Sequence, residues 1–329
     1  MRKLLILLAA ALCLVLGSGV ALASQLKVAA LYTTPVEEPY IGNIHEALEK
    51  AVKDYGIEYQ HTEKVTQADF ERVLREYAEK GFELIFVDAY GNEETTRRVA
   101  KDYPEVSFMA ASDLGPEAPN MGVFTAWIHE PTYLCGLMAG MMTKSNVVGI
   151  VAGLPIPVVN VPANAFVQGV IDANPKCKVL VSYIGSFFDP PKAREAAIAQ
   201  IEAGADVLFA DRYGVIEAAQ SKGIPAFGNM VDQVSLGPDT VVSSPIWVVW
   251  PTVQKVVEDK KAGKFEPINY KEYSMMAKGG AHLAPYHKFE NKLPQNIKDA
   301  VNKRSEEIKS GAFVVPVKTG QAKTHTPAK

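Results

Sequence analysis

The stretch FELIFVDAYGN, residues 82–92, decides the fold class of this chain. Phe82 to Val87 is almost entirely apolar and has the length of a strand, and Asp88 and Tyr90 follow it directly. Such a run has no polar face to present to water, so both faces of the strand must be covered by other elements. A strand that is buried between helices is typical of a parallel sheet in an α/β protein.

The same alternation of strand and helix patterns extends in both directions from this stretch. Leu26 to Tyr32 has the pattern of a strand, and Gly42 to Tyr55 has that of an amphipathic helix that Gly56 ends. Thr66 has the position of a helix cap, and the helix it opens stops at Gly81. The patterns that follow residue 92 predict helices at 93–102 and 131–142 and strands at 106–111 and 121–124.

A second round of the pattern begins near residue 147. It predicts strands at 147–151, 178–183, 207–210, 226–227 and 240–243, and helices at 164–173, 191–203 and 215–222. No strong sequence repeat accompanies it, but the repeated order of elements predicts two doubly wound lobes with a ligand cleft between them. The last segment, with helices at 247–261 and 294–310 and a strand at 273–276, is too short for a third domain.

The expected domain boundaries follow from these two rounds. Residues 24–127 with part of 245–285 are expected to form the N-terminal lobe, and residues 128–244 with part of 286–317 the C-terminal lobe. The polar segment 318–329 is expected to be a disordered tail.

The N-terminus has the three parts of a secretory signal peptide. Arg2 and Lys3 precede an apolar run at 4–16, and small residues lead to an expected cleavage site after about Ala23. A membrane anchor is the alternative, but this run is short for crossing a bilayer. Cys13 follows a leucine, whereas a lipidated cysteine needs a small residue before it, so a lipid anchor is not expected. We therefore expect an exported protein of the periplasm.

Charge and cysteine content narrow the class of protein further. The formal net charge is -3 with both signs dispersed, which disfavours nucleic acid as a partner. Cys135 and Cys177 remain after cleavage, and we expect two buried free thiols, although an exported compartment permits a disulfide.

The six histidines lack metal-ligand spacing, and phosphate-loop, nucleophile-elbow and dinucleotide motifs are missing, so no cofactor, metal or catalytic residue is predicted. An enzyme with an unfamiliar site stays the alternative.

Residues that directly follow the predicted strands are the candidates for the binding site. Parallel sheets bind ligands beyond the carboxyl ends of their strands. These loops combine aromatic rings with polar side chains, which suits a flat heteroaromatic ligand held between rings. The candidate ligand-binding residues are Glu38, Tyr40, Asp88, Tyr90, Trp127, Phe187, Phe188, Asp189, Asp211, Arg212, Asn229, Asp232 and Trp247.

Several of these candidates have an equally simple structural role. Asp189 precedes two prolines and could cap the next helix. Asp88 and Asp211 could hold neighbouring loops, and Trp127 and Trp247 could pack between the lobes. We expect at least one of Phe187 and Phe188, and at most one of Glu37 and Glu38, to face the ligand.

Several short motifs together resemble a known family. These are GLPIP at 153–157, NAF at 164–166 with Gly169, FDP at 188–190 with Lys192, AFG at 226–228, DQ at 232–233 and GG at 279–280. The chain resembles the basic membrane protein, or PnrA-like, family of ABC transporter substrate-binding proteins. The resemblance implies a type I periplasmic-binding-protein fold, a monomer that closes on a purine nucleoside, and an ABC permease in the inner membrane as partner.

Two departures from the family pattern bear on the ligand. In GNMVDQ, residues 228–233, Met230 stands where an acid is expected, and Ala277 stands where a lysine is expected, with Lys278 one place late. Acids and lysines suit the hydroxyls of a ribose. We therefore predict a free purine base before a nucleoside, with another small polar ligand such as a sugar as an alternative. A binding protein that reports to a membrane receptor without transport is the rival function.

Overall fold

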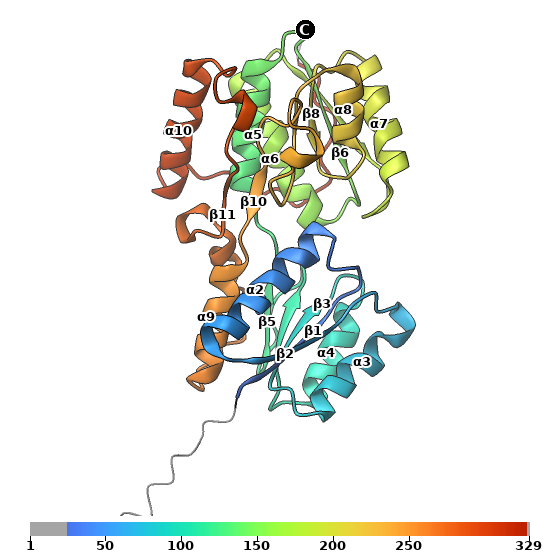
Figure 1. Ribbon diagram of the computed structural model, residues 1–329, viewed down its shortest axis with the longest axis vertical. Helices are drawn as coiled ribbons and strands as arrows, with labels where there is room; N and C mark the ends of the chain where they lie inside the picture. The colour runs from blue at the N-terminus through green and yellow to red at the C-terminus, as the bar shows by residue number, and fades with distance from the viewer. Residues whose placement is uncertain (1–24, 328–329) are drawn as a thin grey trace, which may run out of the picture.

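The computed structural model describes residues 25–327, which form two lobes, each built around a parallel sheet (Figure 1). The predicted signal peptide lies outside the described residues. The strands are β1 Lys27–Leu31, β2 Glu58–Thr62, β3 Leu84–Asp88, β4 Ser107–Ala111, β5 Met121–Phe124, β6 Val147–Ala152, β7 Lys178–Tyr183, β8 Val207–Ala210, β9 Ala226–Phe227, β10 Pro245–Trp247 and β11 Ala281–Leu283. The helices are α2 Pro39–Tyr55, α3 Gln67–Glu79, α4 Glu93–Asp102, α5 His129–Met142, α6 Pro157–Ala173, α7 Pro190–Glu202, α8 Val215–Lys222, α9 Trp250–Lys261 and α10 Gln295–Lys309.

The N-terminal lobe has five parallel strands in the order β2-β1-β3-β4-β5. All five residues of β3 are buried, which confirms the expectation from the run at 82–87. Residues of α3 and α4 share one core with the sheet, and residues of α2 and α9 belong to the core on its other side. Covering both faces in this way is what an apolar central strand requires.

The C-terminal lobe repeats the arrangement with four parallel strands in the order β7-β6-β8-β9. Residues of α7 and α8 pack with the sheet in one core cluster, while α5, α6 and α10 belong to the cluster that continues into the first lobe. The predicted class, two doubly wound lobes with parallel sheets, is confirmed.

Local sequence signals explain how individual helices begin and approach one another. The Thr66 side chain accepts a hydrogen bond from the backbone N–H of Asp69 at 3.3 Å and caps α3 as predicted. Helices α5 and α6 cross at glycines: a Cβ atom on Gly136 would lie 2.2 Å from the Phe166 carbonyl oxygen. No larger residue fits there without separating the helices, so this crossing depends on glycine.

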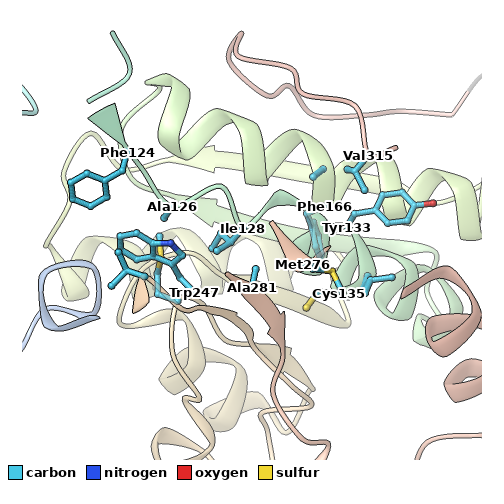
Figure 2. Packing of buried hydrophobic residues seen from close by; sticks show 14 of the residues in the cluster. Phe124, Ala126, Ile128, Tyr133, Cys135, Phe166, Trp247, Met276, Ala281 and Val315 are labelled. Carbon is cyan, nitrogen blue, oxygen red and sulfur yellow. The ribbon is translucent and has the colours of Figure 1, made fainter. Parts of the chain in front are cut away.

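Trp247 lies where the two lobes meet and contacts residues on both sides of the junction. Trp247 in β10 is fully buried, and its ring lies near that of Phe124, with centroids 6.4 Å apart (Figure 2). The Trp247 Nε1–H donates to Ser274 Oγ at 3.1 Å, and the Ser274 hydroxyl donates to the Thr125 carbonyl oxygen at 2.8 Å. The antiparallel pair β10 and β11 completes this hinge region.

Some predicted boundaries were wrong. The strand expected at 273–276 is replaced by short 3-10 helices at Lys271–Ser274 and Met276–Lys278, and the strand comes later as β11. The helix expected from Trp247 begins at Trp250, because residues 245–247 pair with β11. Strand β2 was not predicted. The expectation of two free buried thiols is confirmed at Cys135 and Cys177.

The expectation of a disordered tail was also wrong for residues 318–327. The His325 N–H donates to the Val179 carbonyl oxygen at 2.9 Å, and the Val179 N–H donates back to His325 at 3.0 Å. Asn160 and Asn164 donate side-chain hydrogen bonds to carbonyl oxygens of residues 318–320. The bonds with Val179 satisfy part of the open edge of β7, and those from α6 hold residues 318–320, which explains why a polar segment is held against the lobe.

Candidate functional site

A cavity of about 180 Å³ lies between the two lobes, at the carboxyl ends of both sheets. Its lining comes from the loops after β1, β3, β7, β8 and β9 and from the first turns of α2 and α6. The residues of the lining are Thr33, Thr34, Glu38, Pro39, Tyr40, Ile41, Asp88, Tyr90, Val158, Val159, Phe187, Phe188, Asp211, Arg212, Tyr213, Asn229, Met230 and Gln233.

Asp88 and Thr33 form one polar corner on the N-terminal lobe. Asp88 ends β3 and is buried, and its Oδ2 accepts hydrogen bonds from the backbone N–H of Thr33 at 3.2 Å and from the Thr33 hydroxyl. Burial raises the pKa of Asp88, and these hydrogen bonds counteract part of that rise. The pair therefore fixes the loop after β1 while the carboxylate faces the cavity.

Glu38 belongs to the same wall and begins helix α2. Its Oε2 accepts from the backbone N–H groups of Tyr40 at 2.9 Å and Ile41 at 3.2 Å, as a helix cap does. Burial raises the pKa of Glu38, and the positive charge of Arg212 across the cavity lowers it. The cap thus holds a carboxylate at the cavity opposite a cation of the other lobe.

Asp211, Arg212 and Asn229 form the polar wall of the C-terminal lobe. Asp211 Oδ2 accepts from the Gly153 N–H at 3.1 Å and from Arg212 Nε at 2.8 Å, and Asp211 Oδ1 accepts from Asn229 Nδ2 at 2.9 Å. Arg212 also donates to the Phe187 carbonyl oxygen at 3.1 Å. Asp211 therefore orients Arg212 and Asn229, and both of its own oxygens are engaged by the protein.

Aromatic rings from both lobes also contribute to the lining. Tyr40 contacts the edge of Tyr90 at 6.1 Å between centroids and stacks on Trp247 at 4.9 Å. On the other lobe Phe188 meets the edge of Tyr213 at 6.3 Å, and 63% of Phe188 is exposed. A flat ring system that enters between these walls would find aromatic faces from both lobes.

The side-chain oxygen of Asn229 is a buried polar atom of the lining that has no hydrogen-bond partner among the described residues, and the residue is 3% exposed. Buried polar groups are almost always bonded, so this unpaired oxygen calls for a partner from outside the protein. A ligand with N–H or O–H donors would satisfy Asn229.

Hydrogen bonds also join the lobes beside the cavity. The Val158 N–H at the start of α6 donates to Asp113 Oδ2 at 3.3 Å, and Asn43 Nδ2 donates to the Met230 carbonyl oxygen at 3.5 Å. Burial raises the pKa of Asp113 to about 6. These contacts depend on the lobes lying close together, so they belong to the closed arrangement.

Most of the residues predicted for the site lie on the cavity, and four do not. The structure brings together Glu38, Tyr40, Asp88, Tyr90, Phe187, Phe188, Asp211, Arg212 and Asn229. It leaves Trp127, Asp189, Asp232 and Trp247 outside the lining. Glu37 is exposed and also lies outside it, so one glutamate of the pair faces the cavity, as the prediction allowed.

The four residues outside the lining have structural partners. Asp189 caps α7 by accepting from the Lys192 N–H at 3.1 Å, and Asp232 Oδ2 contacts His287 Nε2 at 2.6 Å. Trp247 is a core residue of the hinge. The Trp127 ring lies beneath the Lys271 ammonium, 4.1 Å from it. These contacts support the structural alternatives given above, which were helix capping for Asp189 and packing for the two tryptophans.

Sequence reasoning missed nine lining residues. They are Thr33, Thr34, Pro39, Ile41, Val158, Val159, Tyr213, Met230 and Gln233. Thr33 and Tyr213 lie in loops that follow strands, so the criterion that identified their neighbours, a position just beyond the carboxyl end of a strand, could also have identified them. Val158 and Val159 reach the cavity because the start of α6 faces the other lobe, and apolar residues at a helix start carry no such signal.

Residues 25–327 lack two features that mark other classes of protein. Over this range the structure contains no cluster of three or more histidine, cysteine, aspartate or glutamate side chains arranged to hold a metal ion. Within the same range, no helix has both the length and the apolar character needed to cross a bilayer.

Comparison with known proteins places the chain among binding proteins. The pattern of the family described as "ABC transporter substrate-binding protein PnrA-like" matches residues 27–312. A purine-binding protein of Brucella abortus is 29% identical over 312 residues, which cover 92% of this chain and 87% of that protein. A putative ABC transporter glucose-binding protein of Haloferax volcanii is 35% identical over 207 residues, but the match covers 62% of this chain and only 53% of that protein's length.

A solved structure is similar over nearly the whole described chain. An ABC transporter solute-binding protein from Conexibacter woesei is 26% identical, with a TM-score of 0.72 over 89% of this chain and 99% of the other.

Proposed function

The chain belongs to the PnrA-like family of ABC transporter substrate-binding proteins, and on that premise we propose that it captures a purine outside the cytoplasm and delivers it to an ABC permease. A free base is favoured over a nucleoside. The single observation that carries this proposal is the cavity between the lobes, in which aromatic rings from both sides surround carboxylate, guanidinium and amide groups.

The size of the cavity supports a base. Its volume is about 180 Å³. An apolar cavity of roughly 150 Å³ accepts benzene in a well-studied case, so this cavity has room for a somewhat larger flat molecule. A ribose would nearly double the size of the ligand that this volume has to hold. Met230, in place of the expected acid, presents no carboxylate to ribose hydroxyls.

Binding would proceed by closure of the lobes. The base would first lie against one wall, and the second wall would then cover its other face. Closure is favoured because the contacts of the second wall form only when ligand is present. Trp247 links the moving parts to the site, since its ring stacks on Tyr40 of the lining and its Nε1–H is bonded to Ser274 of the hinge.

A sugar is the second candidate, because the Haloferax relative carries the name of a glucose-binding protein. Its match covers about half of that protein, whereas the Brucella purine-binding protein matches over nearly its full length. The aromatic lining also favours a planar ligand, although sugars stack on aromatic rings as well. Measurement with both classes of ligand decides between them.

Thermal denaturation of the secreted protein tests the proposal. The panel consists of adenine, guanine, hypoxanthine, xanthine, their nucleosides, glucose and ribose. A ligand at 100 times its dissociation constant adds about 2.7 kcal/mol to the free energy of unfolding, which raises the midpoint by several degrees. We expect purine bases to give the largest rise. A rise with glucose and none with any purine would refute the proposal.

Transport is tested separately from binding. Deletion of the gene should reduce uptake of radiolabelled purine base into cells, and reintroduction should restore it. Normal uptake together with a lost response to external purine would instead favour a sensing function.

A further inference from the structure

Several donors and acceptors on the wall of the C-terminal lobe, which consists of Asp211, Arg212 and Asn229, already bond to other protein groups. Asn229 Nδ2 donates to Asp211 Oδ1 at 2.9 Å and to the Asp211 carbonyl oxygen at 3.5 Å, so both N–H groups of the amide are directed to Asp211, and the unpaired Oδ1 remains as an acceptor. Both carboxylate oxygens of Asp211 are already engaged by the protein, because Oδ2 accepts from Gly153 and Arg212 and Oδ1 accepts from Asn229. This wall therefore offers an acceptor at Asn229 and donors at Arg212.

Arg212 supplies the positive end of the site. Among the described residues that line the cavity, Arg212 alone is cationic. Its Nε and one Nη1–H bond to Asp211 and to the Phe187 carbonyl oxygen, which leaves N–H groups of the guanidinium for a ligand. The two bonds also fix the plane of the group. A guanidinium held in this way is suited to two acceptors that lie side by side.

Glu38 supplies the negative end on the opposite wall. Only its Oε2 serves the helix cap, so Oε1 takes no part in it. The charges of Glu38 and Arg212 act on each other across the cavity, although the two groups form no salt bridge within 4.0 Å. A ligand between them must present acceptors to Arg212 and a donor to Glu38.

From this polarity we propose that the site selects 6-oxopurines over 6-aminopurines, an inference that rests on the proposed purine-binding function. A 6-oxopurine presents O6 and N7 as adjacent acceptors, the pair that arginine reads in a guanine. Its protonated N1 gives the carboxylate of Glu38 a donor. Adenine presents an amino group beside N7, the pair that asparagine reads with its own amide N–H, and here Asn229 has given that amide to Asp211. Adenine also offers N1 as an acceptor, which faces the Glu38 carboxylate unfavourably.

Calorimetric titration with hypoxanthine and adenine tests the inference, because the two bases differ only at position 6 and in the proton on N1. Hypoxanthine should bind at least about tenfold more tightly, which corresponds to about 1.4 kcal/mol. Equal or tighter binding of adenine would overturn the selectivity while leaving the purine function intact. Failure of both bases to bind would refute the free-base assignment of the proposed function, on which this inference rests.

A substitution at Glu38 tests the assigned geometry. Glu38→Gln keeps one oxygen for the helix cap and replaces the other with an amide that donates to N1 of adenine. The ratio of adenine to hypoxanthine dissociation constants should fall by about tenfold or more relative to the parent protein. Glu37→Gln, at the exposed neighbouring residue, is the matched control and should leave the ratio unchanged.

A second variant tests the other end of the site. Arg212→Lys keeps the positive charge but removes the paired N–H groups, and it should lower hypoxanthine affinity more than adenine affinity. Arg194→Lys, on the exposed face of α7, is its control. If Arg212→Lys does not fold, as judged by circular dichroism, the Glu38 pair decides alone. An unchanged ratio in Glu38→Gln would overturn the assignment.

Discussion

Phe188 offers a way to separate ligand binding from folding, because 63% of this residue is exposed although it lines the cavity. Truncation in Phe188→Ala removes a ring that contributes little to the core, so the free energy of unfolding should change by no more than about 0.5 kcal/mol. Covering the exposed part of the ring with a ligand would bury roughly 100 Å². At about 25 cal/mol per Å², that area corresponds to an upper limit near 2.5 kcal/mol.

This limit agrees with the range of about 1 to 3 kcal/mol per base found when a stacking ring is truncated to alanine. The dissociation constant for hypoxanthine should therefore rise roughly ten- to a hundredfold in Phe188→Ala, as measured by calorimetry. Leu114→Ala, at another exposed apolar residue outside the lining, is the control and should leave affinity unchanged. Affinity within twofold of the parent value in Phe188→Ala would show that the ring is not part of the site.

Three further predictions concern charge, ligand class and the C-terminal segment. Because burial raises the pKa of Asp113 to about 6, the folded chain holds this proton more tightly than the unfolded chain. The free energy of unfolding should therefore gain a contribution as pH falls from about 6 to 4, and urea denaturation of Asp113→Asn should lack it. Met230→Asp should lower the dissociation constant for inosine relative to that for hypoxanthine by roughly tenfold in calorimetry, because a carboxylate suits ribose hydroxyls; the left-handed backbone at φ 66° tolerates Asp well. An unchanged ratio would contradict that role for residue 230. Removal of residues 318–329 should lower the free energy of unfolding by about 1 to 3 kcal/mol in urea denaturation, because backbone groups of β7 lose their partners.

The fold could be predicted largely from apolar patterning, and the exceptions have physical causes. Strand β3 is apolar because both of its faces are buried, so its sequence alone identifies it. Strand β2, with the sequence EYQHT, lies at the sheet edge and is only partly buried, so no apolar pattern marks it. The segment 318–327 is polar and is ordered by hydrogen bonds to β7 and α6, which depend on residues far away in the chain.

The site could be predicted where it follows from strand ends, and less well where it depends on contacts between the lobes. Asp88 and Asp211 follow central strands of parallel sheets, so their place at the cavity follows from topology. Trp247 has the same kind of position in sequence, but pairing of β10 with β11 turns its ring into the hinge core. Val158 lies on the cavity because α6 meets the opposite lobe, which a single sequence does not reveal.

A crystal structure of the protein grown with hypoxanthine tests the central claim most directly. We expect one planar ligand in the cavity between the lobes, with a face against Phe188 or Tyr40, its O6 and N7 toward Arg212, and its N1 toward Glu38. A ligand-bound structure with hypoxanthine elsewhere on the surface, or with this cavity filled by side chains, would contradict the assignment of this cavity as the purine site.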